Sequence, residues 1–337
     1  MPGWFLAFVR SGLFEPHRSL TFLRREAIGW EQNLTSPGGN ALRIHTVGIV
    51  GAGTMGRGLA QNVSEKGFEA VLVDRTDELA LEARRGLEIS LNRRLEKWAI
   101  TVAEKRAILG RIKFSSHMEE ISISDLVIES VTENMDVKKQ VFAQLDRFAR
   151  PEVVLASNSS TLSITEMAQA TSRPGRVIGL HFLNPVTETA VVEIVRGLKT
   201  ADDTFEVARG FVKALGKTGV QVYESPGFVT TRLFIPLVNE AMYALMEGVA
   251  SAEDIDTAMR LGYEWERGPL EMADRIGLDT LLAIMETLFR EYGELKFRAC
   301  PLLKKYVRAG HLGVKNGHGF FVYDSEGNRL AEAGAGS

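Results

Sequence analysis

The sequence predicts an α/β fold, in which a mostly parallel sheet domain is followed by an all-helical C-terminal domain. From "HTVGIVGAG" to "VQVYE", short β-branched runs alternate with longer amphipathic ones, as in βαβ units with helices on both faces of a sheet. A glycine-rich turn directly follows the first apolar run. After "ESPGF" the pattern becomes helical only, so we place the domain boundary near residue 224.

The individual elements follow from the same alternation. Strands are expected at 46–51, 69–74, 111–115, 125–130, 152–157, 176–182, 190–196 and 219–223. Helices are expected between them, for example at 54–66, 77–97, 136–148 and 202–215. The run at 77–110 is long for one crossover, so we expect it to project as a helical pair. From 226 to 310 the chain reads as helices separated by glycines.

The ends of the chain do not follow this pattern. We expect a sheet domain over 44–224, a helical domain over 225–324 and a flexible tail over 325–337. Residues 1–43 have aromatic clusters but no sustained period, which favours a disordered extension or a start codon assigned too early. A transit peptide stays open because of Arg10, Arg18, Arg24 and Arg25, although three glutamates argue against it. No basic segment or small-residue cleavage site indicates a secretory signal.

Composition and charge limit the classes of partner. The 337 residues are enough for two domains, and 45% of them are hydrophobic. A net charge of −3 argues against nucleic acid as a partner. The single cysteine, Cys300, excludes an internal disulfide and a cysteine-rich metal site, which fits a reducing compartment. No apolar run reaches the roughly 18 residues of a membrane span. We expect a soluble, cytoplasmic protein without a metal.

The glycine-rich turn predicts a Rossmann-like dinucleotide site. "TVGIVGAGTMGRGLA" places Gly51, Gly53 and Gly56 as G-x-G-x-x-G between an apolar strand and a helix. The first glycine permits a tight turn, the second lets the backbone approach a pyrophosphate, and the third lets the helix pack closely. The helix N-terminus then offers free amides to the phosphates. Thr54 and Met55 lie within this turn, so we expect them beside the cofactor as well.

The end of the second strand selects the cofactor. In "EAVLVDR" the strand ends at Asp74, 18 residues beyond Gly56. A carboxylate at this position bonds ribose hydroxyls and repels a 2′-phosphate. This favours NAD, although Arg75 leaves NADP open. A flavin is the competing cofactor, but no second nucleotide motif follows, so hydride transfer by a nicotinamide is simpler. An ordinary glycine cluster with a strand-end aspartate is the plain alternative.

A histidine and a glutamate in consecutive strands are candidates for acid–base chemistry. Hydride transfer from an alcohol needs a proton acceptor, and "GLHFLNP" ends its strand with His181. Twelve residues later "AVVEIVRG" places Glu193 in an apolar strand, where a carboxylate is costly unless it is paired. If the two strands are neighbours, Glu193 orients the imidazole as a base. The alternatives are a packing histidine and a solvent-facing glutamate.

A third polar stretch follows the strand in "VVLASNSSTL". Its serines and asparagine come directly after the strand, and open α/β sheets bind ligands at the carboxyl ends of their strands. These side chains are therefore placed to bond a substrate oxygen. A turn with a helix N-cap explains the same residues without a ligand.

Seven stretches together resemble one enzyme family. They are "GAGTMGRGLA", "ASNSSTL", "GLHFLNPV", "VVEIVRG", "SPGFVTTRLFIPLVNEAM", "GPLEMADRIGLDT" and "KNGHGFFVYD". In this order they resemble the L-3-hydroxyacyl-CoA dehydrogenases, including bacterial 3-hydroxybutyryl-CoA dehydrogenases, over about residues 44–324. The resemblance implies NAD-dependent oxidation of an L-3-hydroxyacyl-CoA to the 3-oxoacyl-CoA, or the reverse. It also implies an acyl-CoA substrate and a homodimer through the helical domain.

The resemblance also implies residue roles. His181 matches the catalytic base, Glu193 its orienting carboxylate, and Ser160 the serine that bonds the substrate's C3 oxygen. The further cofactor contacts that it implies near the nicotinamide and its ribose are Asn184, Glu133, Lys138 and Lys315. The helical pair at 77–110 matches an arm that lies along CoA, although a solvated charged face fits it equally well.

One position departs from the family pattern. In "PGFVTTR" the residue before the arginine is Thr231, where the family has an asparagine that helps to hold the substrate oxygen. Threonine reaches less far, and losing one polar contact in a transition state typically costs about 2.7–4 kcal/mol. Thr231 therefore leaves two alternatives open. One is an NAD-dependent dehydrogenase of a free hydroxy acid such as gulonate or carnitine, and the other is a catalytically weak dinucleotide-binding protein.

Overall fold

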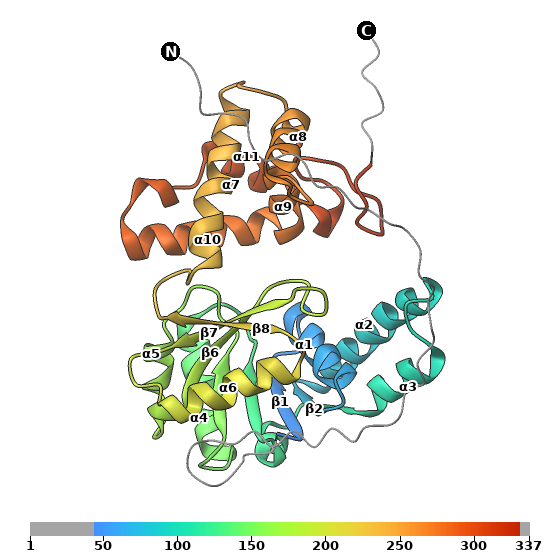
Figure 1. Ribbon diagram of the computed structural model, residues 1–337, viewed down its shortest axis with the longest axis vertical. Helices are drawn as coiled ribbons and strands as arrows, with labels where there is room; N and C mark the ends of the chain where they lie inside the picture. The colour runs from blue at the N-terminus through green and yellow to red at the C-terminus, as the bar shows by residue number, and fades with distance from the viewer. Residues whose placement is uncertain (1–43, 331–337) are drawn as a thin grey trace, which may run out of the picture. The chain divides into compact units, whose positions relative to one another are not determined.

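The computed structural model describes residues 44–330, and the predictions for residues 1–43 and for residues 331–337 of the tail lie outside this range. The described residues form an eight-stranded sheet with the order β3-β2-β1-β4-β5-β6-β7-β8 (Figure 1). The strands are β1 (Thr46–Val50), β2 (Glu69–Val73), β3 (Ile112–Ser115), β4 (Leu126–Glu129), β5 (Val154–Ser157), β6 (Val177–Phe182), β7 (Val191–Arg196) and β8 (Thr218–Tyr223). The β6–β7 pair is antiparallel and the other neighbours are parallel. The predicted strands and the mostly parallel sheet are confirmed.

Helices cover both faces of the sheet, which explains the continuous apolar runs of its central strands. In β4, Leu126 and Ile128 pack in the same core as α1 and α6, whereas Val127 packs in the core that holds α4 and α5. The helices are α1 (Thr54–Glu65), α4 (Met135–Phe148), α5 (Ile164–Ala168) and α6 (Asp202–Ala214). A 3₁₀ turn, η1 (Met118–Ile123), precedes β4, and another, η2 (Pro174–Arg176), precedes β6.

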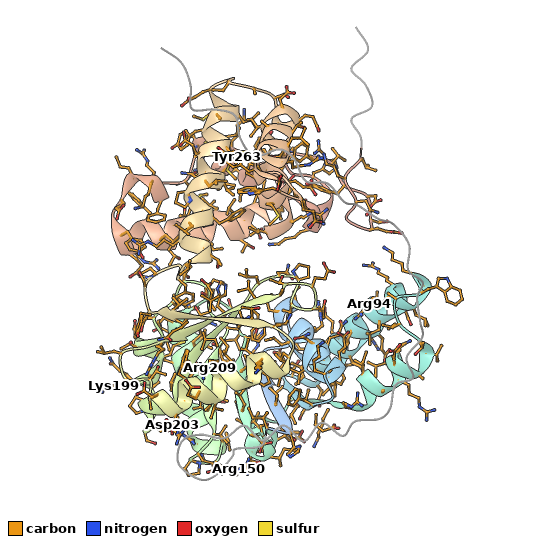
Figure 2. All side chains as sticks on the ribbon, viewed as in Figure 1. Arg94, Arg150, Lys199, Asp203, Arg209 and Tyr263 are labelled. Carbon is orange, nitrogen blue, oxygen red and sulfur yellow. The ribbon has the colours of Figure 1, made fainter. Side chains whose placement is uncertain are left out.

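The predicted helical pair is present as α2 (Asp77–Glu96) and α3 (Val102–Gly110). Thr101 caps α3 in a reciprocal capping box with Glu104, which satisfies otherwise free amides at the helix start. Leu87 and Leu91 bury the inner face of α2 against the sheet core. Arg94 of α2, labelled in Figure 2, pairs with Glu65 at the end of α1. The pair is therefore anchored along its length to the sheet domain.

The C-terminal part is helical, as predicted, with a core of its own. Its helices are α7 (Thr230–Met246), α8 (Ala252–Tyr263), α9 (Pro269–Ile276), α10 (Leu278–Tyr292) and α11 (Pro301–Arg308), with the 3₁₀ turns η3 (Leu295–Phe297) and η4 (Val314–Asn316). The segment after η4 departs from an all-helical part, because isolated β-bridges join Gly313 to His318 and His318 to Val322.

A buried carboxylate holds this last segment in place. Asp274 of α9 is fully buried and accepts hydrogen bonds from the amides of Phe320 and Phe321, at 2.9 Å each. The Tyr323 hydroxyl donates to the same carboxylate at 3.0 Å. "GHGFFVYD" is therefore a hairpin fastened to α9.

A membrane span and a metal site each have structural requirements with which the described residues can be compared. Between residues 44 and 330, no helix is both long enough and apolar enough to cross a membrane. Over the same residues, no group of three or more histidine, cysteine, aspartate or glutamate side chains is arranged to hold a metal ion.

Candidate active site

The glycine loop between β1 and α1 has the geometry that a dinucleotide needs. Gly51 has a φ of +101°, and a Cβ there would lie 2.5 Å from the Ser130 carbonyl oxygen. A Cβ on Gly56 would lie 1.8 Å from the Gly51 carbonyl oxygen, so neither position accepts a larger residue. A Cβ on Gly53 would meet no atom within 4 Å, which leaves that side open to a ligand. The first turn of α1 carries no acidic residue to repel a phosphate. These features fit the pyrophosphate of NAD.

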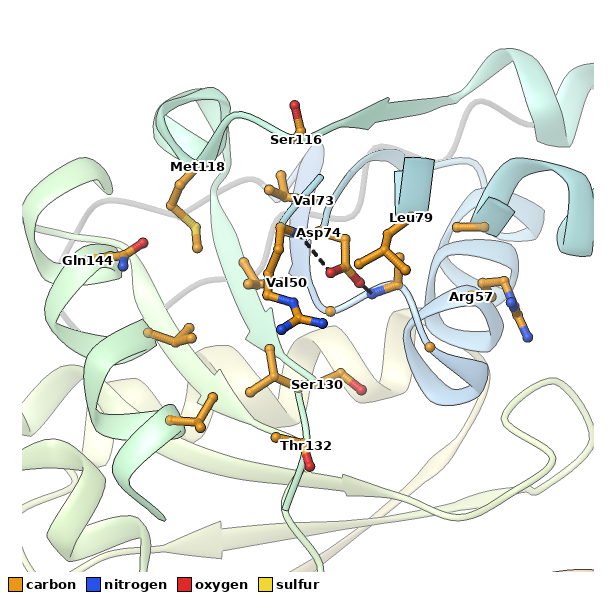
Figure 3. A pocket seen from close by; sticks show the side chains of 18 of the residues that line it. Val50, Arg57, Val73, Asp74, Leu79, Ser116, Met118, Ser130, Thr132 and Gln144 are labelled. Atoms are coloured by element: carbon orange, nitrogen blue, oxygen red, sulfur yellow. Dashed lines mark hydrogen bonds between the residues drawn. The ribbon is translucent and has the colours of Figure 1, made fainter. Parts of the chain in front are cut away.

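A pocket of about 680 Å³ opens beside this loop (Figure 3). Its lining includes Gly51, Gly53 and Asp74, with Met118 and Gln144 on the other side in Figure 3. The Asp74 carboxylate accepts hydrogen bonds from the Ala52 and Arg75 amides, at 2.7 Å each. The acidic side chain is thus held at the pocket wall by the loop itself. Thr54 is exposed at the helix start, whereas Met55 packs partly against the core.

The candidate base pair is formed by strand register. The antiparallel β6–β7 pairing places His181 directly opposite Glu193. The His181 Nδ1 lies 2.6 Å from the Glu193 Oε2, and both side chains are buried. An ionised carboxylate only accepts hydrogen bonds, so it holds the proton on Nδ1 and leaves Nε2 as the acceptor. The ring of Phe228 packs against the imidazole, with ring centroids 5.6 Å apart.

The start of α7 completes the surroundings of Glu193. Its Oε1 accepts the amides of Val229 and Thr230 at 2.9 Å each, and its Oε2 accepts the Thr230 hydroxyl at 2.7 Å. Burial raises the pKa of Glu193, but the bonds from His181 and Thr230 outweigh it and hold the pKa below its usual value. Glu193 is therefore ionised at neutral pH. Thr230 was not among the predicted site residues, since two adjacent threonines give no signal of which one faces inward.

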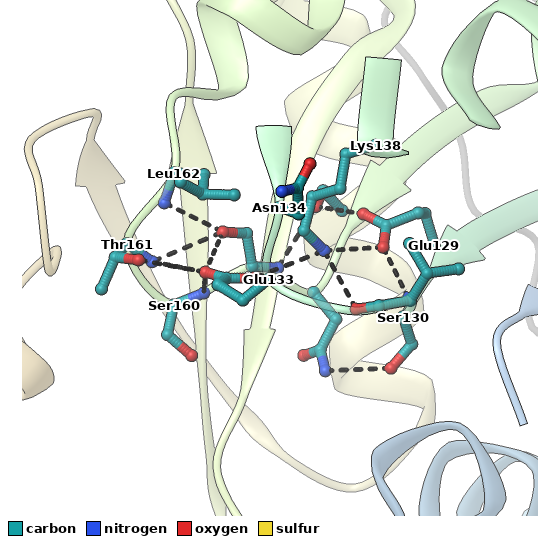
Figure 4. A network of polar contacts seen from close by, with 12 residues as sticks. Glu129, Ser130, Glu133, Asn134, Lys138, Ser160, Thr161 and Leu162 are labelled. Atoms are coloured by element: carbon teal, nitrogen blue, oxygen red, sulfur yellow. Dashed lines mark hydrogen bonds and ion pairs between the residues drawn. The ribbon is translucent and has the colours of Figure 1, made fainter. Parts of the chain in front are cut away.

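The serine loop after β5 is organised by Glu133 (Figure 4). The Glu133 Oε1 accepts the Ser159 hydroxyl at 2.6 Å and the Ser160 and Thr161 amides at 3.0 and 3.1 Å. Burial raises the pKa of Glu133, yet the charge of Lys138 and these hydrogen bonds bring it below its usual value. The Ser160 side chain points away from Glu133 in Figure 4, which leaves its hydroxyl for another partner.

An ion-pair group formed by Lys138, Glu129 and Glu133 adjoins this loop. Lys138 is 1% exposed, and its ammonium lies 2.7 Å from the Glu129 carboxylate and 3.4 Å from that of Glu133. Glu129 also accepts the Ser157 hydroxyl at 2.6 Å. Lys138 is therefore held between the carboxylates of Glu129 and Glu133. Glu129 was another residue that the sequence reasoning missed, because it reads as the last residue of an apolar strand.

The remaining predicted residues lie in different surroundings. Asn184 is exposed three residues after His181, and Thr231 is half-buried in the first turn of α7. The Lys315 ammonium bonds Asp279 and Thr280, each at 2.7 Å, within the helical part. Asn158, which the prediction treated only as part of the serine loop, accepts the Phe182 amide at 2.9 Å and thereby ties that loop to the strand of His181.

A dinucleotide loop in the same sheet as an oriented imidazole defines the class of the protein, which is a dehydrogenase that uses NAD. The chain belongs to the 3-hydroxyacyl-CoA dehydrogenase family. Residues 46–225 match the NAD binding domain of that family, and residues 227–323 match its C-terminal domain.

Individual relatives agree with this assignment. A probable 3-hydroxybutyryl-CoA dehydrogenase from Bacillus subtilis is 45% identical over 285 residues, covering 85% of this chain and 99% of the relative. The 3-hydroxybutyryl-CoA dehydrogenase of Bradyrhizobium diazoefficiens is 42% identical over 280 residues, covering 83% and 96%. The crystal structure of an (S)-3-hydroxybutyryl-CoA dehydrogenase from Ralstonia eutropha is similar with a TM-score of 0.77 at 45% identity, covering 84% of this chain and all of that one.

These similarities confirm the predicted family, fold class and cofactor. The chain is an NAD-dependent oxidoreductase that interconverts a 3-hydroxyacyl-CoA and a 3-oxoacyl-CoA.

Proposed function

We propose that the chain oxidises (S)-3-hydroxybutyryl-CoA, or a closely similar short acyl-CoA, with His181 as the general base. The observation that carries this proposal is the 2.6 Å contact between the His181 Nδ1 and the Glu193 carboxylate in a buried setting. The names of the relatives support the substrate, since they act on 3-hydroxybutyryl-CoA.

The chemistry divides between the cofactor and the chain. NAD, when bound, accepts a hydride from C3 of the substrate. The His181 Nε2 accepts the proton of the C3 hydroxyl, and Glu193 stabilises the imidazolium that results. Because Glu193 already receives four donors, it stays ionised and does not itself take up the proton. In the reverse direction the imidazolium returns the proton to the C3 oxygen.

Two hydroxyls are proposed to orient the substrate oxygen. Ser160 is the first, because its amide is held by Glu133 while its side chain points away from that residue. Thr231 is the second, from the first turn of α7. A donor that is fixed before the reaction stabilises developing charge without reorganising. Glu133 therefore contributes by holding the loop that carries Ser160.

The cofactor site is proposed to extend from the glycine loop to the serine loop. Its proposed contacts are Gly51, Gly53, Thr54, Met55, Gly56, Asp74, Glu133, Asn184 and Lys315. Lys138 is proposed to act through Glu133, because its ammonium is enclosed by two carboxylates and is almost without exposure.

The proposal also covers the oligomeric state and the limits of the two domains. We infer a sheet domain over 44–224, a helical domain over 225–324, and a homodimer through the helical part. Large apolar side chains that are exposed in that part support the dimer, among them Leu233, Val249, Leu261, Tyr263 and Leu295. Figure 2 labels Tyr263 at the end of α8. The cytoplasmic location stays a prediction from the sequence.

The substrate is tested by NADH oxidation with acetoacetyl-CoA and, in parallel, with free acetoacetate. We expect turnover of the CoA ester and little of the free acid. Equal turnover of both would favour the free hydroxy acid alternative. Thr231→Asn is measured beside the wild type. Activity that appears only in this variant would contradict the proposal and point to a dinucleotide-binding role.

A further inference from the structure

One oxygen of Glu193 is shared between the imidazole and a hydroxyl. The Oε2 receives the His181 Nδ1 at 2.6 Å and the Thr230 Oγ1 at 2.7 Å. The Oε1 receives only backbone amides, at 2.9 Å. Thr230 is thus a side-chain donor that competes with His181 for the same acceptor.

The position of Thr230 commits its hydroxyl to this bond. Thr230 is the first residue of α7, so no carbonyl of a preceding helical turn can accept its hydroxyl. The amide of the same residue also bonds Glu193, so Thr230 fixes both oxygens of the carboxylate. None of the donors to Glu193 comes from its neighbour, Thr231.

We propose that Thr230 is a positioning residue that sets how strongly Glu193 supports His181 during proton transfer. The inference rests on the proposed role of His181 as the base. The hydroxyl stabilises part of the negative charge on Oε2, so less of that charge is available to the imidazolium. Without the hydroxyl, Glu193 would hold the imidazolium more firmly, and His181 would release its proton only at higher pH.

The other charged groups on the surrounding elements are engaged elsewhere. Arg196 of β7 pairs with Asp202, and Glu224 after β8 accepts from Ser163 and Thr165. Arg232 of α7 donates to Ser225 and lies over the ring of Tyr292. Neither β5 nor β6 carries another titratable side chain besides His181. Glu193 is therefore the charged group in direct contact with His181.

The test is the pH dependence of kcat/KM for (S)-3-hydroxybutyryl-CoA in the presence of NAD. In Thr230→Val we expect the acid limb of this profile to move to higher pH by about 0.5–1 unit, because a hydrogen bond to a charged group is lost. KM for NAD should stay unchanged, since the residue does not face the dinucleotide pocket. Thr230→Ser keeps the hydroxyl and should restore the wild-type profile.

Thr171→Val is the matched control, since the Thr171 hydroxyl bonds the Ala168 carbonyl at the end of α5. Its profile should overlap that of the wild type. An acid limb in Thr230→Val at the wild-type position, in a folded protein, would overturn the inference. If valine prevents folding, Thr230→Ala takes its place with the same expectation. Full activity of His181→Ala would instead overturn the proposed base, so the two failures are distinguishable.

Discussion

Desolvated carboxylates behave in opposite ways in the two parts of the chain. In the sheet domain, the partly exposed Glu133 and the buried Glu193 have a pKa below the usual value, although desolvation alone would raise it. In the helical part, burial raises the pKa of Asp256 and Asp274, the latter to about 6. All four accept backbone amides, so hydrogen bonding by amides does not explain the difference.

The difference lies in the side-chain partner of each carboxylate. Glu133 lies near the ammonium of Lys138, and Glu193 lies against the imidazole of His181. Asp274 instead has a tyrosine hydroxyl and the repulsive charge of Asp256. A desolvated carboxylate therefore stays charged where an ammonium or the N–H of an imidazole lies beside it. The buried aspartates of the helical part instead hold backbone segments in place through their amides.

The largest expected effect is on catalysis. Glu193→Gln should lower kcat by about 10³–10⁴, because the amide no longer holds the proton on Nδ1 of His181. The fold should persist, since glutamine keeps the shape of the side chain. Steady-state kinetics gives the loss, and circular dichroism serves as the control. A loss of less than tenfold would show that the carboxylate does not support the base.

The next effect is on stability in the sheet domain. Lys138→Met should lower the free energy of unfolding by about 3–5 kcal/mol, because the buried Glu129 carboxylate and the partly exposed Glu133 carboxylate lose their cation. Urea unfolding measures it. Lys139→Met is the matched control, since Lys139 is partly exposed and pairs with Glu166. Its change should stay below about 1 kcal/mol. Similar losses in both variants would contradict the comparison.

A smaller effect is expected in the helical part. Tyr323→Phe removes the hydroxyl that bonds Asp274, at a cost of about 2 kcal/mol in the free energy of unfolding. Chemical denaturation at pH 7 tests this prediction. An unchanged stability would mean that the hairpin is held by its two amides alone.

The smallest effect concerns pH. The pKa of Asp274 is about 6 in the folded protein and about 3.9 in an unfolded chain, so the folded state binds more protons between these values. Its stabilising contribution is complete below about pH 4 and is lost as the pH rises through 6. From pH 7 to pH 5, the wild type should therefore gain about 1 kcal/mol relative to Asp274→Asn. Parallel denaturation curves at the two pH values measure the gain, and a constant difference would contradict it.

The parts that the sequence predicted are those with local signals. The glycine loop and the strands have short periods and fixed spacing, so the sheet, the helical pair and the helical part were all predicted. His181 and Glu193 were predicted as partners only on the condition that their strands are neighbours. The antiparallel pairing of β6 with β7 meets this condition. It is a long-range feature of the sheet, which the local sequence does not show.

The features that the sequence did not predict depend on which side chains are buried and on the direction in which they point. Glu133 and Lys138 lie four and nine residues after Glu129, the buried carboxylate at the end of β4, and this spacing does not reveal that Lys138 is enclosed. Thr230 and Thr231 are identical in type, so only the fold shows which hydroxyl faces Glu193. Asp274 reads as a polar residue of an amphipathic helix until the hairpin covers it. The five-residue helix α5 is too short to give a period.

The most direct test of the account is turnover of acetoacetyl-CoA with NADH by His181→Ala, with His181→Gln beside it. NADH binding by both variants, followed by fluorescence, shows whether the dinucleotide site is intact. The account predicts wild-type NADH binding and a loss of turnover of about 10³ or more, because no other group near Glu193 can take the proton. Turnover near the wild-type rate in either variant would contradict the assignment of His181 as the general base.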